Sequence, residues 1–186
     1  LVRRMLDLAR LNALTENTVT AQEQFDLTEV VSQVIISLES KITGRNLDVD
    51  VQMPDEKLMV WGDPDSITQV CYNLLDNAIK FTPPGGTITI TTRENGSQVL
   101  LRVKDNGVGI LPADAPHIFD RFYKADKAHT VGKGTGLGLA ICRRIMEKHG
   151  QQIRLVSGEG GAEFEITLAK GKQPGGAHGD TGAGQD

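Results

Sequence analysis

The chain has 186 residues, of which 39% are hydrophobic and 4% aromatic, and its 20 basic and 24 acidic residues give a net charge of −4. This length suits one sizeable domain with appendages, and the mildly acidic balance gives no sign of nucleic-acid binding. No apolar run approaches the ~20 residues that span a bilayer, and the first residues lack the pattern of a signal peptide. The composition is therefore typical of a soluble globular protein.

The N-terminal 14 residues have the apolar spacing of a helical hairpin or coiled coil, and an isolated amphipathic helix fits the same pattern. Residues 15–25 are predicted to form a polar link and residues 27–42 the next helix. Later segments alternate in hydropathy and are separated by turn residues, among them Asn95-Gly96 at a predicted hairpin tip. The six predicted strands are residues 47–51, 58–61, 87–92, 99–103, 153–156 and 164–168.

A helix predicted over residues 69–82 has a polar stripe of Gln69, Asn73, Asn77 and Lys80. Asn is a mediocre helix former, and its carbonyl is better used where it meets a cation or a polar ligand. The stripe is therefore interpreted either as the lining of a cleft or as an ordinary polar face. The opposite, apolar stripe consists of Ile67, Val70, Cys71, Leu74, Leu75, Ala78 and Ile79.

The predicted strand 99–103 is followed by Asp105, and then by Gly107 and Gly109 in the run Asp-Asn-Gly-Val-Gly-Ile. A carboxylate at a strand end can accept a hydrogen bond from an exocyclic amine, and the glycines allow close backbone approach. A plain Asp-Asn-Gly turn is the alternative interpretation.

A second glycine cluster, residues 132–139, reads Gly-Lys-Gly-Thr-Gly-Leu-Gly-Leu and runs into a helix predicted over residues 140–149. Backbone amides and the helix dipole at such an entry form a phosphate site, to which Lys133 adds charge. A flexible hinge is the alternative. The P-loop and Rossmann patterns are absent, as are the signatures of eukaryotic-type protein kinases.

The segment between the two clusters, residues 106–133, lacks periodicity and is predicted to be a lid that closes over a ligand. Four apolar or aromatic side chains in it either anchor the lid or dock on a partner helix. These four are Ile118, Phe119, Phe122 and Tyr123.

Both cysteines, Cys71 and Cys142, lie on apolar helix faces. Such positions favour buried free thiols in a reducing compartment over a disulfide or a metal site.

Four motifs, taken together, resemble in order and spacing the catalytic ATP-binding domain of bacterial two-component sensor histidine kinases, within the superfamily that includes gyrase. The N box corresponds to residues 73–82, the G1 box to 105–109, the F box to 118–123 and the G2 box to 134–139. Residues 157–164 are similar to the family's last glycine turn before its final strand.

The resemblance implies an α/β two-layer sandwich, with a mixed, mostly antiparallel sheet and helices packed on one face, and the element order suits this fold. Residues 1–24 are then the end of the dimerisation and phosphoacceptor helix with its linker, and residues 25–170 the catalytic domain. Residues 171–186 offer no apolar side chains to bury and are predicted to be a disordered tail.

The resemblance also implies roles for individual residues, with ATP and Mg²⁺ as ligands. Asp105 is expected to read the adenine amino group, Asn77 to supply an oxygen to Mg²⁺ and Asn73 to face the same ion. Lys80 and Lys124 are expected to place charge on the phosphate tail, and with Asn73 and Asn77 they are the predicted catalytic residues. The remaining predicted nucleotide-binding residues are Gly107, Gly109, Ile110, Lys133, Gly134, Thr135, Gly136, Leu137, Gly138 and Leu139.

The implied activity is transfer of the ATP γ-phosphoryl group to a histidine, for relay to a response regulator. Hydrolytic members of the superfamily have Glu where this chain has Asn73, so slow intrinsic hydrolysis is expected. None of His117, His129, His149 and His178 lies in the context of the family's phosphorylated helix, so the acceptor is expected upstream of residue 1.

The expected partners are a second copy of the chain, through its dimerisation helices, and a response regulator. The expected location is cytoplasmic, with any membrane anchor in upstream segments. Two other functions remain open: a nucleotide-binding regulatory module that transfers nothing, and a serine kinase of the anti-sigma-factor type on the same fold.

Overall fold

The computed structural model of the chain describes residues 2–13, 21–124 and 136–174. Its helices are α1 (Val2–Ala13), α2 (Leu27–Ser37), α3 (Glu39–Gly44), α4 (Pro64–Phe81) and α5 (Gly138–Lys148), with a short 3₁₀ turn, η1 (Ala115–His117). Its strands are β1 (Glu23–Asp26), β2 (Asp48–Gln52), β3 (Met59–Gly62), β4 (Thr87–Asn95), β5 (Gln98–Asp105), β6 (Ile153–Ser157) and β7 (Glu163–Lys170).

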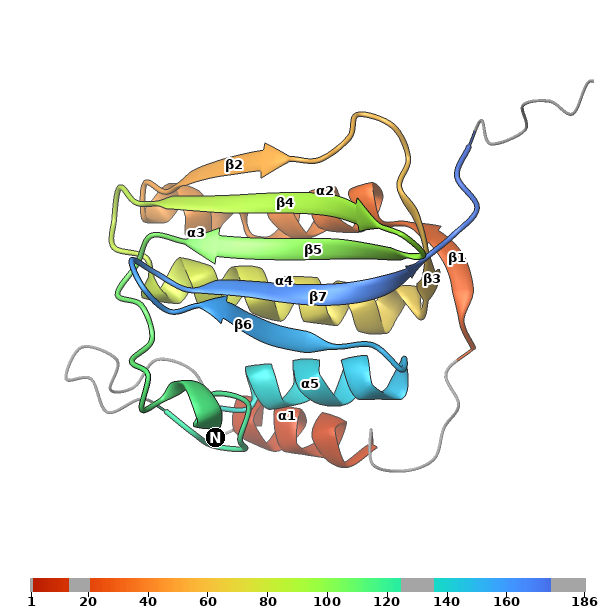
Figure 1. Cartoon of the computed structure of the whole chain (residues 1–186). Helices are drawn as coiled ribbons and strands as arrows, with labels where there is room; N and C mark the ends of the chain where they lie inside the picture. Colours follow the sequence, from red (N-terminus) through yellow and green to blue (C-terminus); the bar gives the residue numbers. More distant parts are fainter. Residues whose placement is uncertain (1, 14–20, 125–135, 175–186) are drawn as a thin grey trace, which may run out of the picture.

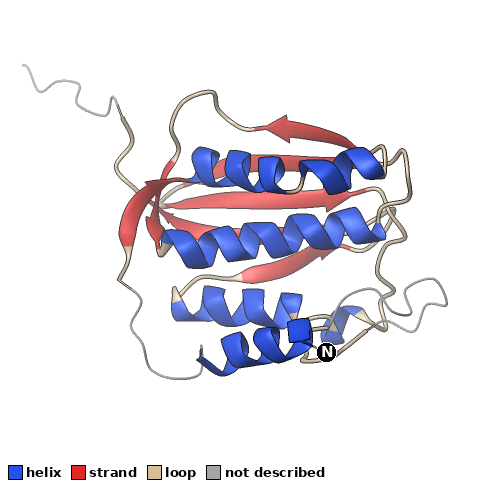
Figure 2. Ribbon diagram, turned by 180° about the vertical axis from the view of Figure 1, so that it is seen from behind, coloured by secondary structure: helices blue, strands red, loops and turns tan. Residues whose placement is uncertain are grey.

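The strands form one seven-stranded sheet in the order β1-β3-β7-β5-β4-β2, with β6 also paired to β7 (Figure 1). Among the described strands, β2 and β4 pair in parallel and the other pairs are antiparallel. The helices lie over one face of this sheet, and none covers the other face in the part of the chain that the structure describes (Figure 2). The predicted two-layer sandwich with a mixed, mostly antiparallel sheet is confirmed.

The helix α4 lies at the centre of the helical layer and contacts both α2 and α5. It begins at Pro64, which favours a first helical position because proline lacks the amide that would go unpaired there. All seven residues of its predicted apolar stripe are buried, including the free thiol of Cys71. The helix ends before Thr82, whose hydroxyl donates to the Ala78 carbonyl at 2.6 Å.

The predicted hairpin is confirmed, since β4 and β5 pair in register up to Asn95 and Gln98. Gly96 takes a φ of +59° between the two strands, in the left-handed region that glycine tolerates. Alternate residues of β5, namely Val99, Leu101 and Val103, are buried toward the helices. The chain direction of β5 then delivers Asp105 to one end of the sheet.

Two sequence predictions about the N-terminal half are wrong. Residues 23–25, predicted as part of a polar link, belong to β1, which pairs with β3 although it buries only Phe25. The single helix predicted over residues 27–42 is two helices, because the chain breaks at Leu38 with φ −105° and ψ 4°. Leu38 is 1% exposed, so the helical spacing of apolar residues continues across the break. The sequence pattern therefore gives no sign that the helix is interrupted there.

The segment after β7 is ordered further than the sequence predicted. Gly171 donates its amide to the Met59 carbonyl, and the side chain of Gln173 both accepts from and donates to the Met59 backbone. The predicted tail therefore does not begin at residue 171, and residues 175–186 lie outside the described part of the chain.

The first helix, α1, packs against α5 at the edge of the helical layer. Its Val2, Met5 and Leu6 side chains are exposed, while Leu8 packs against the core. No helix within the described residues has both the length and the apolar character that crossing a membrane requires.

Candidate functional site

The loop after β5 is bonded to the end of α4. Val108 donates its amide to the Phe81 carbonyl at 3.3 Å, and a Cβ on Gly107 would lie 2.2 Å from the same oxygen. Only glycine fits at position 107, because real Cβ atoms do not approach a carbonyl this closely. The two predicted motifs, 105–109 and the helix 69–82, are therefore joined at one end of the sheet.

Asp105 is 5% exposed and is held by backbone amides. Its Oδ1 accepts hydrogen bonds from the amides of Gly107 at 2.9 Å and Ala162 at 3.2 Å. No basic side chain pairs with it among the described residues. Burial raises the pKa of the Asp105 carboxyl, and the two amide hydrogen bonds offset only part of that rise. A buried carboxylate without a counter-ion is typical of a group kept for a ligand.

The glycine turn between β6 and β7 closes around Asp105. Gly161 has a φ of +121°, and a Cβ there would lie 1.8 Å from the Asp105 carbonyl oxygen. The Asp105 amide donates to the Ala162 carbonyl, and the Ile110 amide donates to the carbonyl of Gly158. This turn, which the sequence indicated only as a similarity at residues 157–164, positions the carboxylate directly.

The polar stripe of α4 faces the start of α5. Gln69 Nε2 donates to Asn73 Oδ1 at 3.0 Å, and Asn73 Nδ2 donates to the Gly138 carbonyl at 3.3 Å. Asn77, one turn further along, is half-buried, and its side chain forms no hydrogen bond within the described residues. The stripe is therefore not an ordinary solvated face.

The described part of the second glycine cluster leads into α5. Gly136 has a φ of +73° and accepts a hydrogen bond from the Phe122 amide at 2.8 Å, which ties this part of the predicted lid to the turn. Leu137 is fully buried, and within the described residues no side chain caps the first turn of α5, the kind of helix start that can bind an anion. Leu139 packs against the core, whereas Lys133, Gly134 and Thr135 lie outside the described residues.

The lid is described as far as Lys124, which is exposed. Ile118 and Phe119 pack against the core, and the Phe119 ring meets the Phe164 ring edge-on with 6.1 Å between centroids. Tyr123 donates to Asp114. Phe122 is 41% exposed, so part of the predicted apolar group anchors the lid and part of it remains at the surface.

Sequence analysis missed Asp76, a buried carboxylate within α4. Its Oδ1 lies 2.9 Å from Lys41 Nζ and its Oδ2 lies 2.8 Å from Lys80 Nζ. Burial acts to raise the pKa of Asp76, but the hydrogen bonds from Lys80 and Lys41 outweigh it and hold the pKa below its ordinary value. The signal available in the sequence was an acid among apolar residues, with a lysine four positions later.

The side chains of the site decide how the protein could bind Mg²⁺. Within the described residues no three His, Cys, Asp or Glu side chains lie together as a metal cage. Mg²⁺ in nucleotide sites takes one or two protein oxygens besides phosphates and water, and the Asn77 amide, which forms no hydrogen bond to the described residues, fits that need. Cys71 and Cys142 are buried free thiols, and burial raises the pKa of each to about 12.

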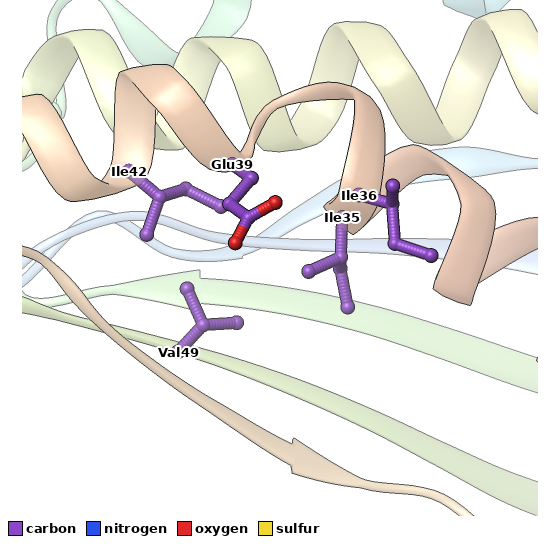
Figure 3. A pocket seen from close by; sticks show the side chains of 5 residues that line it. All are labelled: Ile35, Ile36, Glu39, Ile42 and Val49. Atoms are coloured by element: carbon purple, nitrogen blue, oxygen red, sulfur yellow. The ribbon is translucent and has the colours of Figure 1, made fainter.

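An apolar hollow of about 250 Å³ lies elsewhere, between α2, α3 and β2 (Figure 3). Its lining contains none of the predicted site residues. The residues around it are Ile35, Ile36, Glu39, Ile42 and Val49.

Comparisons with known proteins identify the family. Residues 62–172 match the family model described as Histidine kinase-, DNA gyrase B-, and HSP90-like ATPase. The sensor protein SrrB of Staphylococcus aureus (strain NCTC 8325 / PS 47) is 39% identical over 173 residues, which cover 91% of this chain and 29% of SrrB. The chain thus spans less than a third of that relative.

Solved structures agree with this match. The catalytic domain of histidine kinase ThkA is 33% identical with a TM-score of 0.73, covering 81% of this chain and 96% of that one. ThkA in complex with the response regulator protein TrrA is 29% identical with a TM-score of 0.69, covering 90% and 49%. The mycobacterial sensor histidine kinase MprB is 27% identical with a TM-score of 0.69, covering 81% and 98%. The chain therefore belongs to the histidine kinase-, DNA gyrase B- and HSP90-like ATPase family, and within it to the catalytic domains of histidine kinases.

Proposed function

We propose that the chain binds ATP and Mg²⁺ and transfers the γ-phosphoryl group to a histidine upstream of its own first residue. One observation carries the proposal: four motifs far apart in sequence are joined at one end of the molecule. The loop 105–109 bonds to Phe81, Asn73 bonds to Gly138, and Phe122 bonds to Gly136. Each junction brings a predicted nucleotide-binding segment to the same region.

The adenine base is proposed to lie against Asp105. Because Oδ1 is occupied by two backbone amides, Oδ2 is the oxygen that meets the exocyclic amine. Gly107 and Gly109 keep the backbone close, and Ile110, which packs against the core, offers an apolar contact to the ring. A buried acceptor of this kind discriminates strongly against bases that lack the amine.

The phosphate tail is proposed to lie along α4 toward the start of α5. Asn77 and Asn73 face the metal side, and the amides of residues 134–139 hold phosphate oxygens, with charge added by Lys80, Lys124 and Lys133. Asn77, with Asn73 beside it, would hold Mg²⁺, and the ion would supply positive charge against the charge that develops on the phosphates. The residues of the chain itself orient the tail and exclude water, and Asn73 has no proton-accepting carboxylate with which to activate a water molecule.

The proposed partners follow from this activity. The acceptor histidine lies upstream of this chain, in dimerisation helices of which α1 is the last part. A response regulator then receives the phosphoryl group from that histidine. ATP and response regulators are cytoplasmic, so this domain is placed there, with any anchor upstream.

Phosphoryl transfer tests the proposal in a chain extended upstream through the expected dimerisation helices. Incubation with γ-labelled ATP and Mg²⁺ is expected to give an acid-labile, base-stable phosphohistidine, and Asn77→Ala should abolish it. Steady-state hydrolysis by the 186-residue chain should stay slow. Rapid hydrolysis, or acid-stable phosphoserine in an added substrate, would overturn the proposal.

ATP binding without any transfer in the extended chain would instead support the regulatory module. Absence of MgATP binding, measured by calorimetry, would overturn the nucleotide site itself. The two results separate loss of the reaction from loss of the ligand.

A further inference from the structure

The three charged groups Lys41, Asp76 and Lys80 connect α3 to the proposed phosphate site. We propose that Lys41 is a second counter-ion for Asp76, which allows Lys80 to exchange Asp76 for the phosphate tail of ATP. Lys41 is thus a positioning residue that acts through Lys80. This inference rests on the proposed function, since it needs ATP as the ligand.

The geometry divides the carboxylate between two cations. Asp76 Oδ1 meets Lys41 at 2.9 Å, and Oδ2 meets Lys80 at 2.8 Å, so each oxygen has its own ammonium partner. The Asp76 side chain is 8% exposed, against 43% for Lys41 and 30% for Lys80. The carboxylate is therefore buried, while both ammonium groups lie nearer to solvent.

Burial makes the number of counter-ions matter. An ionised carboxylate in the interior is costly unless a cation pairs with it, and removal of its only partner is strongly destabilising. If Asp76 had Lys80 alone, a phosphate could attract Lys80 only by leaving a buried charge unpaired. Because Lys41 remains on Oδ1, the departure of Lys80 leaves one ion pair in place.

Lys80 is suited to exchange partners. A lysine carries three donors on a flexible stem, so its ammonium can leave one acceptor for another without movement of the helix. On the same stripe, Asn73 donates to the Gly138 carbonyl at the start of α5. The phosphate tail is more highly charged than a carboxylate, which favours the exchange.

The two lysines come from different helices. Lys80 lies on α4 with Asp76, in an i,i+4 pair, whereas Lys41 comes from α3. Arg45, in the residue after α3, donates to the Thr82 carbonyl at the end of α4 at 2.6 Å, which holds the two helices together there. The position of α3 therefore decides whether Asp76 keeps its second partner.

The test is a double-mutant cycle read by calorimetry, with MgATP and adenosine as ligands. Lys41→Met should weaken MgATP binding about two- to fivefold, the effect of one partly screened ion pair, and leave adenosine binding unchanged. In a Lys80→Met background, Lys41→Met should have no further effect. The double variant Lys41→Met/Asp76→Asn should bind MgATP at least as tightly as the unmodified chain.

The control is Lys170→Met, which removes a lysine that is 30% exposed, as Lys80 is, from its pair with Glu94 and should leave both affinities unchanged. Three results would each overturn the inference. Lys41→Met could weaken MgATP binding equally with and without Lys80, or weaken adenosine binding as much as MgATP binding. The Lys41→Met/Asp76→Asn variant could still bind MgATP more weakly than the unmodified chain. Absence of MgATP binding by the unmodified chain would overturn the proposed function instead.

Discussion

Two buried carboxylates at different places on the sheet have opposite surroundings. Glu165, 3% exposed on the face without helices, bonds Arg102 through Oε2 at 2.6 Å and Arg154 through Oε1 at 2.8 Å. Burial acts to raise its pKa, but the two arginines outweigh burial and hold the pKa below its ordinary value. Asp105, 5% exposed at the end of β5, has only backbone amides on one oxygen, and burial raises its pKa.

The difference teaches that burial alone does not mark a functional acid. Both carboxylates are almost completely removed from solvent, yet only Glu165 has its charge cancelled by the protein. Cross-strand register explains why, since Arg102 and Arg154 lie directly opposite Glu165 on β5 and β6. Asp105 keeps an oxygen and a charge for something outside the chain.

The largest expected effect is that of Asp105→Asn on ATP binding. The asparagine carbonyl would keep the two backbone amides, so its NH₂ group would face the adenine amine, donor against donor. Loss of a hydrogen bond to a charged group costs about 1.5–3 kcal/mol, so affinity should fall about 10- to 100-fold by calorimetry. Stability to urea should stay constant or rise, because a buried charge is removed. A parallel fall in affinity and stability would contradict this role.

Glu165→Gln should give the reverse pattern. One charge is lost from between two arginines, and because those arginines are 34% and 55% exposed, the pairs are partly screened by solvent. Urea unfolding should show a loss of about 1 kcal/mol, while MgATP affinity stays unchanged. A change in affinity without a change in stability would show that the helix-free face contributes to the nucleotide site.

The pH dependence of the unfolding free energy distinguishes the two carboxylates further. Glu165 has a lowered pKa in the folded protein, so its contribution is present above its unfolded pKa and lost as pH falls through the folded pKa. Asp105 has a raised pKa, so the cost of its charge is present at neutral pH and disappears as pH falls through that folded pKa.

The difference in unfolding free energy from the unmodified chain should therefore be negative for Glu165→Gln and zero or positive for Asp105→Asn at pH 7. The Asp105→Asn difference should shrink as pH falls toward the ordinary carboxyl pKa of about 4, whereas the Glu165→Gln difference should shrink only as pH falls below that value. Urea unfolding at several pH values measures this. Curves of the same sign would contradict the assigned surroundings.

Sequence analysis predicted what depends on local pattern. The buried stripe of α4, the hairpin at Asn95 and the close approach at Gly107 all follow from periodicity or glycine chemistry. It missed β1 because Glu23–Asp26 buries a single apolar side chain, and its strand is defined by pairing with β3.

The site was predictable in the same partial way. Asp105 and Asn73 could be chosen from motifs, but the partners that hold them come from distant segments: Ala162 from the turn before β7 and Gly138 from α5. The contact of Lys41 with Asp76 joins positions 35 residues apart, and no local pattern specifies it. Tertiary packing decides such pairs, which is why the ion pair of Lys41 with Asp76 could be found only in the structure.

Asn73 shares one feature with each carboxylate. Its Oδ1 and Nδ2 are both hydrogen-bonded within the protein, as both oxygens of Glu165 are, yet it lies in the proposed site, as Asp105 does. Gln69→Leu removes the donor to Asn73 Oδ1 and should lower stability by only about 0.5 kcal/mol, the value of one i,i+4 pair. If the bond orients Asn73 for the reaction, the rate of phosphoryl transfer in the extended chain should fall about threefold while MgATP affinity is retained. Gln33→Leu is the matched control, since Gln33 makes the same i,i+4 bond to Glu29 on α2. An equal change in transfer rate for both variants would mean that the Gln69 bond is structural only, and Asn73 would then belong with Glu165.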